Sequence, residues 1–178
     1  MPVIALLRGI NVSGKNMIKM DRLKALFEAL GYREVRTYIQ SGNVVFDTDA
    51  PASAVADAVE RRIREELSYN VKVLVRTSRE LEEIAARNPF GAADASEGEP
   101  PYVTFLFGEP SPEALAKLEA SRRGDDEVRV LGREAYVLCR NGYGKTPLSN
   151  SFLEKKLDVY ATTRNWKTIH ALIEMSRS

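Results

Sequence analysis

The first polar segment of the chain has the composition of an anion-binding loop. Residues 8–16 read Arg-Gly-Ile-Asn-Val-Ser-Gly-Lys-Asn and follow a short apolar run. Arg8, Lys15, Asn11 and Asn16 supply hydrogen-bond donors, and two glycines give the backbone freedom to turn. Loops of this kind hold phosphate or carboxylate groups where a strand passes into a helix. The segment therefore predicts a ligand site, although it names no reaction.

Part of this segment matches the phosphate-binding pattern Gly-x-x-x-x-Gly-Lys through Gly9, Gly14 and Lys15. A nucleotide-binding loop continues with Ser or Thr, which holds magnesium, whereas this chain has Asn16. The helical pattern that follows begins only near Asp21, a residue type that favours the N-cap. The sequence therefore favours a strand-to-helix turn with a surface ligand role over a nucleoside triphosphatase.

Two further polar segments could contribute to the same site. Gln40, Ser41 and Asn43 lie in a glycine-bearing turn between two strand-like runs, and Arg164 and Asn165 precede the last helical pattern. Side chains at element ends can converge with unbonded backbone N–H groups. One hypothesis is a cationic pocket for an anionic ligand. The alternative is that these side chains only bond to loop backbone and tie the parts of the chain together. In the pocket hypothesis the cations are Arg8, Lys15 and Arg164, and the orienting amides are Asn11, Gln40, Asn43 and Asn165.

The sequence offers no clear catalytic base. His170 is the only histidine, and Trp166 on a neighbouring helical turn indicates a partly buried structural role for it. Trp166 itself is expected in the core, and Cys139 is expected to be a buried, inert thiol. One cysteine and one histidine exclude disulfide frameworks and Cys/His zinc sites. We therefore predict no cofactor and identify no metal site, and an enzyme acting on a phosphorylated metabolite or a nucleotide stays open as an alternative.

The order of predicted elements places these segments in two similar halves. Strand-like runs and helical stripes follow the order βαββαβ plus one helix over residues 1–90, and the same order recurs over residues 102–178. Residues 91–101 have the composition of a connector. A βαββαβ unit is the ferredoxin-like motif, a mainly antiparallel sheet with helices on one face. The sequence therefore predicts an α+β protein of two ferredoxin-like subdomains in tandem, each followed by an extra helix.

Local signals set several expected boundaries within these halves. Asp21 and Ser151 are expected to be helix N-caps. Thr77 and Glu80 have the spacing of a capping box, which should open a short helix. The alternating run 35–39 is expected to form one strand of a β-hairpin.

Charge and hydrophobicity limit the classes of partner. The 178 residues carry 26 basic and 25 acidic side chains, a formal charge of +1, so nothing global attracts the chain to nucleic acid or to an anionic membrane. An RNA-recognition sheet needs aromatic side chains on which bases stack, and the central strands offer only Phe46. This disfavours binding of nucleic acid without excluding it.

Apolar runs fall well short of the roughly 20 residues of a membrane span, and a signal-peptide pattern is missing, so we expect a cytoplasmic protein. An uncovered sheet face would favour a homodimer or packing between the halves. Binding of a single-stranded nucleic acid would depend on the basic side chains Arg8, Lys15, Lys19 and Arg36.

Four motifs together resemble a known family. They are ALLRGINV with GKN over residues 5–16, TYIQSGNV over 37–44, NPF over 88–90 and TTRNWKT over 162–168. In this order they make essentially the whole chain similar to the bacterial family named for domain of unknown function 1697. Ser13 departs from the family pattern, where glycine is more usual, and leaves the character of the loop intact. The resemblance implies two ferredoxin-like subdomains and no established activity, cofactor or substrate.

Overall fold

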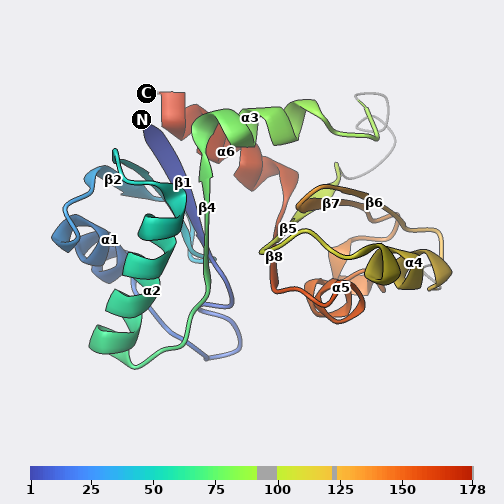
Figure 1. Cartoon of the computed structure of the whole chain (residues 1–178), viewed down its shortest axis with the longest axis horizontal. Helices are drawn as coiled ribbons and strands as arrows, with labels where there is room; N and C mark the ends of the chain where they lie inside the picture. The colour runs from blue at the N-terminus through green and yellow to red at the C-terminus, as the bar shows by residue number, and fades with distance from the viewer. Residues whose placement is uncertain (92–99, 122–123, 178) are drawn as a thin grey trace. The chain divides into compact units, whose positions relative to one another are not determined.

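The structure is a computed structural model (Figure 1). The chain divides into two compact units. One unit comprises Met1–Ala85 with Thr168–Ser178, and the other comprises Ala86–Lys167. Each unit contains one four-stranded sheet. The expected connector, residues 91–101, lies mostly outside the described part of the chain. The structure describes residues 1–91, 100–121 and 124–177.

The sheet of the first unit has the strand order β2-β3-β1-β4, and every neighbouring pair is antiparallel. The first strand of the chain therefore lies between the third and the fourth, as in the ferredoxin-like motif. The elements of this unit are β1 (Pro2–Leu7), α1 (Met20–Ala29), β2 (Arg33–Thr37), β3 (Asn43–Asp47), α2 (Ala52–Leu67), β4 (Val73–Thr77) and α3 (Ser78–Ala86).

Helices α1 and α2 cover one face of this sheet. Their apolar residues recur at helical spacing, and Phe27 of α1 and Val59 of α2 are fully buried against alternate residues of β1 and β3. The rings of Phe27 and Phe46 meet edge to face, with centroids 5.2 Å apart. Burying each large apolar side chain contributes about 1.5–3 kcal/mol. This core therefore holds β1 and β3, whose ends carry the first two predicted ligand segments.

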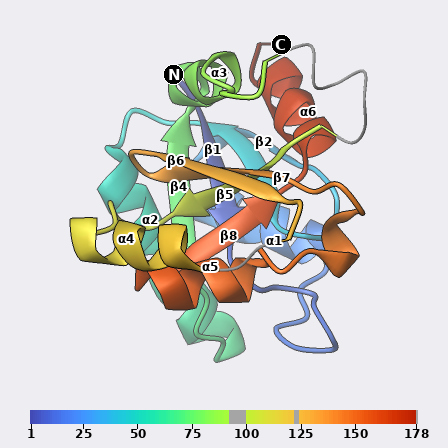
Figure 2. The same cartoon turned by 90° about the vertical axis from the view of Figure 1, so that its right-hand side faces the viewer.

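The second unit repeats the arrangement. Its strand order is β6-β7-β5-β8, again with every neighbouring pair antiparallel, and Figure 2 shows α4 and α5 side by side on one face of the sheet. The elements are β5 (Tyr102–Leu106), α4 (Pro112–Ala120), β6 (Glu127–Leu131), β7 (Glu134–Leu138), the 3-10 turn η2 (Tyr143–Lys145), α5 (Asn150–Leu157), β8 (Ala161–Arg164) and α6 (Trp166–Arg177). The predicted fold class, two ferredoxin-like βαββαβ units with an extra helix after each, is confirmed.

Helix α6 begins in the second unit, and the part from Thr168 onward groups with the first unit. There it lies beside α3 (Figures 1 and 2), and Arg177 Nε donates to Glu82 Oε1 at 3.3 Å. The expected subdomains, 1–90 and 102–178, assign the last helix to the second half of the chain, whereas the compact units assign most of it to the first unit. Those subdomain boundaries stay a prediction. Within the three described ranges, no helix is long and apolar enough to cross a membrane.

The capping box that opens α3 is confirmed. The Thr77 amide donates to Glu80 Oε1 at 2.9 Å, and the Glu80 amide donates to Thr77 Oγ1 at 3.1 Å. The expected caps of two other helices were wrong. Helix α1 begins after Lys19 rather than after Asp21, and α5 begins after Ser149 rather than after Ser151. The Ser149 hydroxyl accepts a hydrogen bond from the Phe152 amide at 3.2 Å. In both cases the N-cap lies two residues earlier in the chain than expected.

Tyr136 of β7 is fully buried in the second unit, and burial raises the pKa of its phenol to about 12. The folded protein therefore holds the phenol proton more tightly than the unfolded chain, whose tyrosines titrate near pH 10. The stabilising contribution of this group is complete below pH 10 and is lost as the pH rises toward 12.

We expect the free energy of unfolding of the wild type to fall more steeply between pH 10 and pH 12 than that of Tyr136→Phe. Urea denaturation at several alkaline pH values measures both slopes, and the difference between the two proteins removes the contribution of every other titrating group. Parallel curves would show that the environment of Tyr136 does not perturb its ionisation.

Candidate functional site

The predicted anion-binding segment starts where β1 ends. The Leu7 amide donates to the Gly42 carbonyl at 2.9 Å, and the Arg8 amide donates to the Lys72 carbonyl, also at 2.9 Å. These bonds continue the pairing of β1 with both of its neighbours beyond the named strands. Ile10 follows and is fully buried. The start of the segment is therefore fixed by the sheet and by the core.

The middle of the segment is a small β-hairpin. Val12 and Lys15 form a β-bridge, and the Lys15 amide donates to the Val12 carbonyl at 2.9 Å. Ser13 and Gly14 between them both have left-handed backbones, with φ of 52° and 75°, as a two-residue type I′ turn requires. Figure 2 shows the blue chain of this region extending beyond the sheet of its unit. The Gly-x-x-x-x-Gly-Lys pattern therefore folds as a projecting hairpin.

Asn11 joins this hairpin to the turn before β3. Its Oδ1 accepts from the Ile18 amide at 2.7 Å, and its Nδ2 donates to the carbonyls of Ile18 at 3.0 Å and Gln40 at 2.8 Å. Asn16 Nδ2 donates to the Gly9 carbonyl at 3.1 Å. These are bonds to loop backbone, the arrangement described by the alternative interpretation of the asparagines. Contact of either side chain with a ligand stays a prediction.

The turn before β3 closes around a third asparagine. Asn43 is fully buried, and its Nδ2 donates to the Tyr38 carbonyl at 2.8 Å and to Ser41 Oγ at 2.9 Å. The Tyr38 amide donates to the Asn43 carbonyl at 2.9 Å. The first two predicted ligand segments thus form one hydrogen-bonded element at one end of the sheet. We name residues 8–18 and 38–43 together the loop pair.

Three apolar side chains project from the loop pair and were not anticipated from the sequence. Val12 is 56% exposed, Met17 53% and Ile39 50%. Ile39 also has a left-handed φ of 47°, a conformation that costs a β-branched residue about 1–3 kcal/mol. The run 35–39 predicts a strand because its apolar residues alternate, but β2 ends at Thr37. No signal in the sequence marks Ile39 as a turn residue, since its conformation depends on the bonds of its neighbours.

The charged side chains of the loop pair are all basic. Neither of its two segments contains an aspartate or a glutamate. Lys15 is exposed, as is Lys19 directly after the first segment, and Arg8 is half-buried. Among the residues with described positions, Lys15 and Lys19 have no ion-pair partner. Together with the adjoining Lys19, the loop pair therefore forms a local cationic patch on a nearly neutral protein.

The third predicted segment belongs to the second unit. Arg164 at the end of β8 is buried, and its Nη1 donates to Thr162 Oγ1 at 2.6 Å and to the Thr163 carbonyl at 3.0 Å. Burial lowers the pKa of Arg164 to about 10, which leaves it a cation at neutral pH. Asn165 is exposed and directly precedes α6. A meeting of Arg164 with Arg8 and Lys15 of the first unit stays a prediction.

Two side chains near this segment lie differently from their expected positions. Trp166 is half-buried and lines a pocket together with Asn165, so its assignment to the core was wrong. His170 is exposed rather than partly buried. Both residues lie in the first two turns of α6, where only one side of the helix is covered. Cys139, by contrast, is buried and outside any disulfide, as predicted.

Asp47, the acidic residue of β3, is remote from the loop pair in the sheet. Asp47 lies at the far end of β3 from Asn43, which at the usual strand rise of about 3.3 Å per residue is about 13 Å away. The Met1 ammonium donates to Asp47 Oδ1 at 2.5 Å and holds the pKa of that carboxyl below its ordinary value. Glu134 lies in the other unit, paired with Arg87 at 2.9 Å. Asp47 therefore cannot act as a general base for a ligand at the loop pair.

The fold and the loop pair define a class of α+β protein with two ferredoxin-like units, in which asparagines tie the first strand-to-helix loop to the first hairpin turn. The chain belongs to the family described as protein of unknown function DUF1697, whose family model matches residues 1–136. The resemblance read from the motifs is thereby confirmed.

The solved structures include a similar protein, the conserved bacterial protein SP0830 from Streptococcus pneumoniae. It is 24% identical in sequence, the alignment covers 98% of this chain and 97% of that one, and the TM-score is 0.72. At this level of identity the likeness shows a shared fold. The comparison with curated proteins finds no match.

Proposed function

We propose that this is a binding protein that recognises an anionic group through the loop pair. Two observations carry the proposal. Lys15 and Lys19 are exposed and have no ion-pair partner among the described residues. The backbone of the loop pair is held in place by three hydrogen bonds of the Asn11 side chain. A binding surface whose backbone is already ordered loses less conformational entropy when its ligand binds. Lys15 and Lys19 are the proposed anion contacts.

The other residues of the loop pair have roles that follow from their surroundings. Gln40 is exposed and its carbonyl is held by Asn11, so its side-chain amide is positioned to orient the ligand. The asparagines provide the scaffold. Because Val12, Met17 and Ile39 flank the lysines, we propose a ligand that combines a phosphate or carboxylate with an apolar part. We propose that it is encountered in the cytoplasm.

Binding is favoured over catalysis because the carboxylate of β3 lies far from the loop pair. An enzyme acting on the same anion needs a general base within hydrogen-bond reach of the reacting atoms. Asp47 is held by Met1 at the opposite end of β3. A regulatory or carrier role needs only the cationic patch and its rigid support.

The proposal is tested by removing the two lysines together. In the double variant Lys15→Ala, Lys19→Ala, we expect the affinity for the preferred anion to fall about tenfold or more, since each charged contact contributes about 1 kcal/mol or more. A thermal shift screen of the wild type with glucose 6-phosphate, adenosine 5′-monophosphate and citrate identifies that anion, and calorimetry measures its affinity.

The matched control is the double variant Arg33→Ala, Arg79→Ala. Both side chains are exposed in the same unit. Arg33 lies opposite Asp47, and Arg79 follows the end of β4 that pairs with Val3, so this variant loses the same net charge at the end of the sheet opposite the loop pair. It should bind like the wild type. If no anion in the screen stabilises the fold, or if the two double variants bind equally, the loop pair is not an anion site.

A further inference from the structure

A second candidate site lies in the other unit, where β8 passes into α6. It is a pocket of about 190 Å³ lined by Pro100, Tyr102, Asn165, Trp166 and Lys167. Drug-sized ligands occupy pockets of roughly 300–1,000 Å³. This pocket therefore has room for a single ring system, with the rest of a ligand outside it.

Aromatic rings dominate the walls of the pocket. Tyr102 stacks on Tyr143, with ring centroids 4.6 Å apart and an angle of 25° between the planes. That contact fixes the plane of the Tyr102 ring, because both rings belong to residues packed at the edge of the second core. Trp166 is half-buried, which leaves part of its indole accessible from the pocket. Rigid aromatic walls are a surface on which a planar ring can stack.

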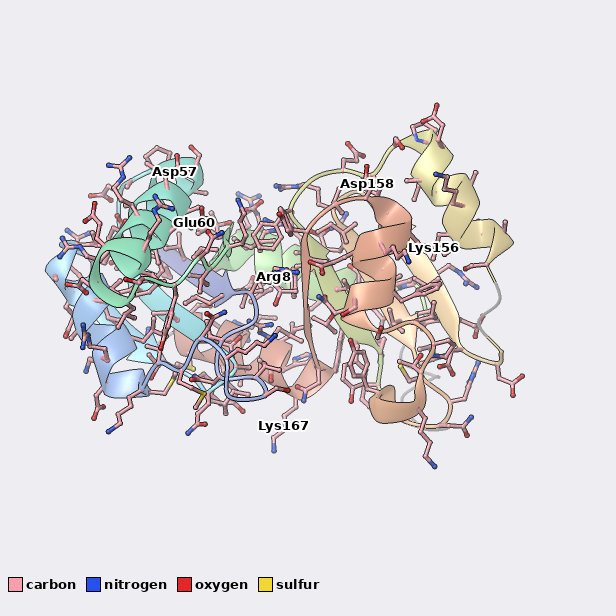
Figure 3. The ribbon with its side chains drawn as sticks, turned by 90° about the horizontal axis from the view of Figure 1, so that it is seen from below. Arg8, Asp57, Glu60, Lys156, Asp158 and Lys167 are labelled. Carbon is pink, nitrogen blue, oxygen red and sulfur yellow. The ribbon has the colours of Figure 1, made fainter. Side chains whose placement is uncertain are left out.

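The polar side chains at the pocket are cationic or neutral. Lys167 is exposed, and Figure 3 shows its side chain reaching outward from the start of α6. Asn165 adds an amide, and none of the described residues that line the pocket is acidic. The buried Arg164 cation precedes these residues in the chain. An anionic group at the mouth of the pocket would therefore meet the positive charge of Lys167.

We infer that this pocket binds a nucleoside monophosphate. The base stacks on the aromatic walls formed by Tyr102 and Trp166, the phosphate lies at the mouth against Lys167, and Asn165 hydrogen-bonds the ribose or the base edge. A proline-rich peptide, the other usual ligand of aromatic pockets, would make no use of the lysine. This inference concerns the second unit and does not depend on the anion site of the loop pair.

The chain contains one tryptophan, so intrinsic fluorescence reports directly on this pocket. Titration of the full chain with adenosine 5′-monophosphate should quench Trp166 fluorescence, excited at a wavelength that adenine does not absorb. Adenosine should bind about tenfold more weakly because it lacks the phosphate. Inorganic phosphate alone should leave the fluorescence unchanged, because it cannot stack on the indole.

Lys167→Ala should weaken binding of the monophosphate about tenfold and leave adenosine binding as it is in the wild type. The matched control is Lys155→Ala, which removes an exposed lysine from the same unit. This variant should bind the monophosphate and adenosine as the wild type does. Tyr102→Phe keeps the ring and should bind normally, which shows that stacking rather than the phenol oxygen is used.

Three outcomes would overturn the inference. The first is the absence of quenching at millimolar monophosphate. The second is equal affinity for adenosine and its monophosphate, because the charge would then play no part. The third is a trinucleotide that binds more than about tenfold tighter than the monophosphate, which would make the pocket one end of a longer nucleic-acid groove. A trinucleotide of equal or lower affinity supports the assignment to a free mononucleotide.

Discussion

Gly42→Ala is expected to lower the free energy of unfolding by about 2–5 kcal/mol. Two costs add. Gly42 has a φ of 91°, and a left-handed backbone costs an L-residue with a side chain about 1–2 kcal/mol. A Cβ at this position would also lie 2.8 Å from Ile10 Cδ1 and 2.9 Å from Leu7 Cβ, and overpacking of this kind costs about 1–3 kcal/mol.

The contact with Leu7 has no easy relief. Leu7 Cβ is attached directly to the backbone of β1, and the Leu7 amide is bonded to the Gly42 carbonyl. Both Leu7 and Ile10 are fully buried. The substitution must therefore move the end of β1 away from the hairpin turn, which would also separate the two halves of the loop pair.

Gly31→Ala is the matched control, because Gly31 has the same φ of 91° and nothing within 4 Å of the added Cβ. It should show the backbone cost alone, about 1–2 kcal/mol. Urea denaturation followed by circular dichroism measures both variants. Equal losses of stability would mean that the approach of Gly42 to Leu7 and Ile10 has no energetic importance.

The second large effect is expected for Asn11→Ala, with a loss of about 2–3 kcal/mol. The change removes one hydrogen bond accepted from the Ile18 amide and two donated to backbone carbonyls, each with a net value of about 0.5–1.5 kcal/mol. Ile18 is buried, so water cannot fully replace the partner of its amide. The loop pair should lose its connection between hairpin and turn.

Hydrogen exchange at the Ile18 amide is the direct measurement, and its protection should fall by far more than that of amides in β5 of the second unit. Asn16→Ala is the control within the same loop. Asn16 also has a left-handed backbone, with φ of 50°, but its side chain makes one hydrogen bond, to the Gly9 carbonyl. Asn16→Ala should therefore lower the free energy of unfolding by only about 1 kcal/mol. If Asn11→Ala costs no more than Asn16→Ala, the loop pair is not held by Asn11.

The architecture could be predicted from local patterns because each element carries its own signal. Leu23 and Phe27, like Val55, Val59 and Ile63, recur at helical spacing and are all buried against the sheet. The capping box before α3 needs only neighbouring residues to form. A repeated order of such elements is enough to indicate two ferredoxin-like sheets.

The candidate sites were less predictable, for a physical reason that Asn11 and Trp166 illustrate. Asn11 looked like a ligand donor, yet its bonds go to Ile18 and to Gln40, which is 29 residues away. Trp166 looked like a core residue, because size and apolarity do not reveal which side of a helix the rest of the fold leaves uncovered. The function of a polar or aromatic side chain depends on neighbours that are distant in sequence.

The sequence by itself determined the family, the two βαββαβ units and the basic, acid-free composition of the loop pair, because these depend on residue type and on spacing within single elements. Only the tertiary structure decided that residues 11–16 form a type I′ hairpin, that the asparagines hold it to the turn at residues 38–43, and that Ile39 is held exposed with a left-handed backbone. Only the fold placed Tyr102 and Trp166 around one pocket. Hydrogen bonds and ring contacts between distant segments exist only after the sheets have formed, so no local pattern in the chain encodes them.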